Sequence, residues 1–244
     1  MLSSTASSNP GRVVLPTVAI LGMGMLLRAL EPVVASSFQE RGEQLAALAG
    51  QGGMPAVLGG LRSVVARGFW LRAQRAWEQR DATGMETLIG LTVAADERPL
   101  YFWLNGARML AHDVPAWLPV TTPGSVKRRL GEEQARRAVR LLERGLRWHG
   151  ADASLYVEMA NIHLHRLGDP GAAAQCYRQA AEQPGAPYYA ARIHAELLRE
   201  LGRPREALAW LRQLLPTLPA TDPAARRDVV LGRIQALEQE LAEP

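Results

Sequence analysis

Residues 167–180 read LGDPGAAAQCYRQA, and residues 201–214 read LGRPREALAWLRQL. The two stretches lie 34 residues apart, and they share a Leu-Gly pair and small or apolar residues at matching places. Each stretch predicts a helix, a turn centred on glycine, and a second helix that opens on small residues. A period of this length built from paired helices is typical of a stacked helical array. The sequence therefore predicts an all-α fold made of antiparallel helix pairs.

The remaining chain also has the spacing of helices, with apolar residues recurring at intervals of three and four. The segment 112–124 is different, because it contains three prolines and has no period. We expect a hydrophobic segment over 1–35, degenerate helical repeats over 36–111, a linker loop over 112–124, and repeats with a C-terminal capping helix over 125–244. A half-polar final helix is what ends such a stack.

The N-terminal segment is apolar. Val13 to Leu27 runs fifteen residues without a charge, whereas a full membrane span needs about 20 residues. Three interpretations stay open: a retained single-pass anchor, a signal sequence cleaved after Ala35, and a buried helix of a soluble protein. The first two both export the repeats. We therefore expect a single-pass protein of a bacterial inner membrane, with its soluble part outside the cytoplasm.

The segment 153–216 resembles the tetratricopeptide repeat family. The residues that carry the resemblance in the first repeat are Ala160-Asn161, Leu167-Gly168-Asp169, Ala173, Tyr177 and Ala180. Those in the second repeat are Ala195, Leu201-Gly202, Ala207, Leu211 and Leu214. The first repeat departs from the pattern because it carries one extra residue. The resemblance implies a right-handed superhelical array in which the first helix of each pair lines a concave surface.

A second resemblance concerns the N-terminal half. Gly60-Leu61-Arg62 and Phe69-Trp70-Leu71-Arg72-Ala73 follow a short apolar segment, as in membrane-anchored bacterial repeat proteins of undefined function. This resemblance implies membrane attachment and brings no activity with it.

The concave surface is the first candidate binding site. The resemblance implies a protein-binding groove lined by Asn161, His165, Arg192, Glu196 and Arg199. Their mixed charge favours a protein surface or an extended segment as the ligand. The Lys and Asn pattern with which some family members hold a C-terminal carboxylate is missing, so a receptor for chaperone tails is not indicated. The simpler alternative is that these residues are solvated polar side chains.

A basic stripe on one predicted helix is the second candidate. It consists of Arg129, Arg136, Arg140, Arg144 and Arg147. Between residues 126 and 148 there are eight positive residues and three glutamates, an excess of five, against +4 for the whole chain. Such a stripe could bind phospholipid headgroups, an acidic protein or nucleic acid. Nucleic acid is the least expected ligand because no aromatic residues interleave with the stripe. The alternative is a solvated outer face.

Catalytic and metal chemistry find no support in the sequence. A single cysteine, Cys176, excludes a disulfide framework and a cysteine-based metal site. His163 and His165 are two residues apart, so on a helix they point about 200° apart and cannot share a metal. No nucleophile elbow, phosphate-binding glycine loop or HExxH motif is present. We therefore expect no enzyme activity, no cofactor, no metal and no small-molecule substrate.

These observations favour a membrane-anchored scaffold that mediates protein–protein interaction in a bacterial envelope complex. Its partners would be proteins of that complex, together with the membrane through the N-terminal segment. Two alternatives remain open. One is an exported soluble adaptor or chaperone, released by cleavage. The other is an accessory subunit of a membrane enzyme or transport assembly.

Overall fold

The computed structural model describes the backbone of residues 55–242 and the side chains of residues 62–242. Every regular element in this part of the chain is a helix, and no strand occurs among residues 55–242, so the predicted all-α fold is confirmed. The predicted N-terminal segment over 1–35 lies outside the described residues, as does the first part of the predicted region 36–111.

The N-terminal half of the described chain consists of four α-helices, α3, α4, α5 and α7, and a short helical stretch made of η1 and α6 between the last two. The elements are α3 (Pro55–Glu78), α4 (Ala82–Ala95), α5 (Leu100–Arg108), the π-helical turn η1 (Met109–Asp113), α6 (Val114–Ala116) and α7 (Gly124–His149). Aromatic side chains join α3 to α5, because the ring of Trp70 packs against Tyr101 at 5.5 Å and Phe102 at 5.3 Å.

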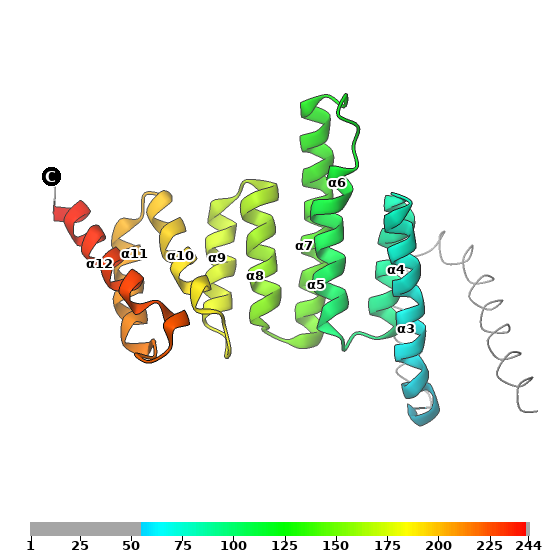
Figure 1. Cartoon of the computed structure of the whole chain (residues 1–244), viewed down its shortest axis with the longest axis horizontal. Coiled ribbons are helices and arrows are strands. Elements are labelled where there is room, and N and C mark those ends of the chain that lie inside the picture. The colour runs from blue at the N-terminus through cyan, green and yellow to red at the C-terminus, as the bar shows by residue number, and fades with distance from the viewer. Residues whose placement is uncertain (1–54, 243–244) are drawn as a thin grey trace, which may run out of the picture. The chain divides into compact units, whose positions relative to one another are not determined.

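The C-terminal half is a row of shorter helices. The elements are α8 (Ala153–Ile162), the π-helical turn η2 (His163–Leu167), α9 (Pro170–Ala181), α10 (Tyr188–Glu200), α11 (Pro204–Leu214), the 3₁₀ turns η3 (Leu215–Thr217) and η4 (Pro223–Ala225), and α12 (Arg227–Ala242). From α7 onward each α-helix packs against the next one in the sequence, and short turns reverse the chain between them (Figure 1).

The sequence positions these helices through caps and turns. Asp152 begins α8 by accepting hydrogen bonds from the backbone N–H groups of Ser154 and Leu155, at 2.8 and 3.2 Å. The two glycines of the repeated turn, Gly168 and Gly202, have φ values of +63° and +72°. This left-handed conformation ends a helix at low cost only for glycine, which has no Cβ. The 34-residue spacing therefore corresponds to the same turn made twice.

The turn η2 explains the extra residue of the first repeat. Before η2, equivalent buried positions are 35 residues apart: Leu155 matches Ala190, and Ile162 matches Leu197. After η2 the spacing is 34 residues. A π turn bonds residue i to residue i+5 and so holds one more residue than an α turn. The helix that runs through α8 and η2 thus absorbs one inserted residue and keeps both of its ends in register.

The predicted linker loop over 112–124 is shorter in the structure. The chain stays helical through η1 and α6, and α7 begins at Gly124, so only residues 117–123 lie outside helices. Side chains fix this connection to the body: the indole Nε1 of Trp77 donates to Asp113 at 2.7 Å, and its ring packs against Trp117 at 6.4 Å. The proline content correctly indicated a break, but it did not show that helix continues as far as Ala116.

The hydrophobic core consists of two clusters of buried residues. The larger cluster runs from Ala66 to Leu197 without interruption across the predicted linker. The smaller cluster runs from Ala195 to Leu237, and the two overlap in α10. Cys176 is buried in the larger cluster, as its position on a predicted helix indicated, and burial raises the pKa of its thiol to about 11.

Candidate protein-binding groove

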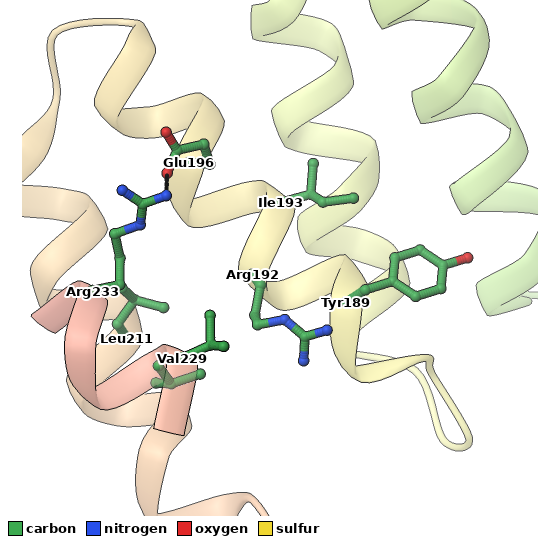
Figure 2. Close-up of a pocket in the computed structure, with 8 residues that line it drawn as sticks. Tyr189, Arg192, Ile193, Glu196, Leu211, Val229 and Arg233 are labelled. Carbon is green, nitrogen blue, oxygen red and sulfur yellow. Dashed lines mark ion pairs between the residues drawn. The ribbon is translucent and has the colours of Figure 1, made fainter. Parts of the chain in front are cut away.

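A groove of about 250 Å³ lies where α10, α11 and α12 meet (Figure 2). Its walls include two of the predicted groove residues, Arg192 and Glu196, both on α10. The complete lining is Tyr189, Arg192, Ile193, Glu196, Leu211, Val229, Val230 and Arg233. The floor is therefore apolar and the rim is charged, which is the combination typical of sites that bind a short protein segment.

Glu196 lies at the centre of the polar rim. One of its carboxylate oxygens accepts from Nη2 of Arg199 at 2.7 Å. The other pairs with Nη2 of Arg233 on α12, also at 2.7 Å (Figure 2). The hydrogen bond to Glu196 raises the pKa of the Arg199 guanidinium. Because these side chains are partly exposed, each pair adds little to stability. The charge network instead fixes which oxygens and nitrogens a ligand meets.

The start of α12 is held against α10 and α11 by two arginines. Arg227 donates through Nη1 to the carbonyl oxygens of Leu215 and Leu218, at 2.9 and 2.5 Å. Arg192 donates through Nη1 to the carbonyl oxygen of Ala225 at 3.2 Å. The capping helix forms one wall of the groove. The predicted groove residue Arg192 also stabilises the segment that leads into this helix.

The other predicted groove residues lie elsewhere. Asn161 accepts a hydrogen bond from the hydroxyl of Tyr177 at 2.6 Å, which ties α8 to α9. His165 is exposed on η2. The structure thus places Arg192 and Glu196 in the groove, and Arg199 pairs with Glu196 without lining the groove. Asn161 and His165 do not line it.

Five residues of the groove were not singled out from the sequence: Tyr189, Ile193, Val229, Val230 and Arg233. Three of them belong to α12, which was predicted only as a capping helix. The feature of the sequence that could have indicated a role of this helix in the groove is the apolar pair Val229-Val230 near its start. Val230 is buried, whereas Val229 is 40% exposed and lines the groove.

The five arginines of the predicted basic stripe are all exposed on α7. Arg136 pairs with Glu132 at 3.0 Å, and the guanidinium of Arg144 lies 5.9 Å from the ring centre of Trp103. Within the described residues no ion pair is recorded for Arg129, Arg140 or Arg147. The stripe is therefore an exposed row of arginines on a helix whose opposite face is buried.

Two of the described histidines lie within hydrogen-bond distance of backbone carbonyl groups. Nδ1 of His194 lies 2.8 Å from the carbonyl oxygen of Ala174, and Nε2 of His149 lies 3.0 Å from that of Glu97. Residues 62–242 contain no group of three His, Cys, Asp or Glu side chains placed to hold a metal ion.

Comparisons with protein-family models, with curated proteins and with solved structures found no match. Among the helices of residues 55–242, none combines the length and the apolar character that crossing a lipid bilayer requires.

Proposed function

We propose that this protein is a membrane-anchored scaffold that binds a protein segment in the groove between α10 and α12. In this proposal the pairs α8–α9 and α10–α11 are tetratricopeptide-like repeats of a right-handed superhelix. Residues 1–35 form the anchor, and the bound segment belongs to another subunit of a bacterial envelope complex.

The observation that supports this proposal is the groove itself. An apolar floor made by Ile193, Leu211 and Val229 is open beside a partly exposed charge network centred on Glu196. Apolar side chains of a ligand would gain free energy by leaving water on such a floor. The arginines and the glutamate around it would select the polar groups that accompany them.

A matched pair of substitutions on α12 tests the groove. Val229 and Leu231 are 40% and 44% exposed, but only Val229 lines the groove. Val229→Glu would place a charge against the apolar floor, and we expect recovery of the partner to fall about tenfold or more. The measurement is a crosslinking pull-down from native membranes, quantified against the unmodified chain.

Leu231→Glu is the control for this experiment, because it adds the same charge to the same helix outside the groove. Recovery of the partner should be unchanged with this variant. Equal losses with both variants, or no loss with either, would show that the groove is not the binding surface.

The anchor is tested separately. A retained anchor predicts that the native protein stays in the membrane fraction after a high-salt wash and that its intact mass includes residue 1. A mass that begins at Ser36 would replace the anchor with the exported, soluble alternative.

A further inference from the structure

A second cavity, of about 350 Å³, lies on a different part of the molecule. It is formed by the first turns of α7, by α6, and by the two π turns η1 and η2. Its charged or titratable lining residues are His112, Lys127, Arg128, Glu132 and Arg166. None of them belongs to the groove beside α12.

The cavity has a positive excess. Lys127, Arg128 and Arg166 carry permanent charges, and Glu132 is the single carboxylate among the lining residues. That carboxylate already pairs with Arg136 at 3.0 Å, outside the cavity. A small anion that entered the cavity would therefore meet three cations. The negative charge of Glu132, which would repel the anion, is partly balanced by Arg136.

Arg166, which lines the cavity, has a polar atom without a hydrogen-bond partner in the described part of the chain. Its Nε is buried and has no hydrogen-bond partner among the described residues. A Cβ at Gly131 would lie 3.4 Å from Nη2 of Arg166, which is ordinary contact distance, so the guanidinium lies against the first turns of α7. A buried donor without a partner is costly, and its presence in a folded protein calls for an explanation.

The other buried polar side-chain atoms without a protein partner lie on the same two elements. Within the described residues they are Oε1 of Gln134 on α7 and Nδ1 of His163 on η2. The helix α7 and the π turn η2 pack against each other. Unpaired buried polar groups are thus concentrated where a π turn meets α7, and π turns are frequent at functional sites.

We propose that this cavity binds a phosphate-bearing ligand through Arg166, with Lys127 and Arg128 as supporting cations. A guanidinium presents two parallel N–H groups that match two phosphate oxygens. The volume falls within the range of sites that hold small molecules. The phosphate could belong to a free small molecule or to a lipid headgroup, and the experiment separates these two sources.

The experiment uses the full chain and titrates it with inorganic pyrophosphate by isothermal calorimetry. We expect saturable binding that weakens about tenfold or more in Arg166→Gln, because the paired N–H donors and their charge are lost. The control is Arg147→Gln, which removes an exposed charge at the far end of α7 and should change the affinity less than about twofold.

A second arm measures binding to phosphatidylcholine vesicles with and without phosphatidic acid. If pyrophosphate does not bind, but phosphatidic acid raises vesicle binding of the unmodified chain and not of Arg166→Gln, the ligand is a lipid headgroup. If Arg166→Gln does not fold, as judged by its circular dichroism, Arg128→Gln at the rim of the cavity takes its place.

Two results would overturn the proposal. One is the absence of saturable binding in both arms. The other is equal weakening by the cavity variant and by Arg147→Gln, which would indicate unspecific attraction to the positive face of α7. Neither result bears on the groove beside α12, since Val229→Glu leaves this cavity intact.

Discussion

At the scale of single residues, His194 shows how position in the core changes the chemistry of a side chain. Its Nδ1 lies 2.8 Å from the carbonyl oxygen of Ala174, and its ring packs edge-on against Trp210 at 4.7 Å. Burial lowers the pKa of His194, and the hydrogen bond to Ala174 opposes this shift only in part. The folded protein therefore favours the neutral imidazole.

This shift predicts how stability depends on pH. Because the pKa of His194 is lower in the folded state than the unfolded value of about 6.5, the two states bind protons equally above that pH. Below it the unfolded chain takes up the proton first, so the melting temperature should fall between about pH 7 and pH 5. His194→Gln should make this fall shallower.

The control is His165→Gln, because His165 is exposed on η2. Its slope of melting temperature against pH should match that of the unmodified chain. The pKa of His112 is also lowered, first by burial, so part of the slope should persist in His194→Gln. A slope that does not change in His194→Gln would contradict the assignment.

At the scale of elements, the repeated turn depends on glycine. Gly202 has a φ of +72°, whereas Gly232 lies within α12 and has no atom within 4 Å of the position that a Cβ would take. Gly202→Ala should lower the free energy of unfolding by about 1 to 2 kcal/mol. Gly232→Ala should raise it by about 0.5 to 1 kcal/mol. Denaturant titrations of both variants measure the two values, and changes of the same sign would contradict this account of the turn.

The π turn η2 makes a prediction about deletions. Removing His165 should convert η2 into an α turn and leave α8 and α9 in register, at a cost of about 1 to 2 kcal/mol. Removing Gln175, which is exposed in the middle of α9, should rotate the following Cys176 and Tyr177 by about 100° out of the core. We expect that deletion to prevent folding. Circular dichroism and denaturant titration compare the two, and equal damage would contradict the insertion model.

These elements show what the sequence could reveal. The helix pairs of 153–216 were predictable because the repeated glycines Gly168 and Gly202 mark the turn inside each pair. The π turns were not predictable, because a π turn and an α turn use the same residue types.

At the scale of the whole molecule, the two core clusters predict uneven stability. Leu237 is buried in the smaller cluster and Ile89 in the larger one. In an array where each helix contacts mainly its neighbours, a cavity weakens the local unit most. Leu237→Ala should therefore speed hydrogen exchange in α11 and α12, and Ile89→Ala should do so in α4 and α5.

Hydrogen-exchange mass spectrometry of the two variants measures this difference, with the unmodified chain as the reference. Each variant serves as the control for the other. A uniform increase in exchange along the described chain in both variants would show that the helices unfold as one cooperative unit.

The candidate groove could be predicted only in part, for a reason that belongs to this scale. Arg192, Glu196 and Arg199 share one face of α10, and helical spacing alone reveals that face. Their partners Val229 and Arg233 lie more than 28 residues further along the chain, on a helix whose direction depends on Arg227 and its two carbonyl acceptors. Neither local spacing nor composition encodes that direction.

The burial of Cys176 has a practical consequence for spectroscopy. The thiolate is the reactive form of cysteine, and a thiol with a pKa of about 11 is almost entirely protonated near neutral pH. We therefore expect the native thiol to react much more slowly with maleimides than an exposed cysteine does while the protein is folded. Cysteines introduced at exposed positions can then carry fluorescent dyes or spin labels without removal of the native one, so distances between α7 and α12 become measurable in an otherwise unmodified chain.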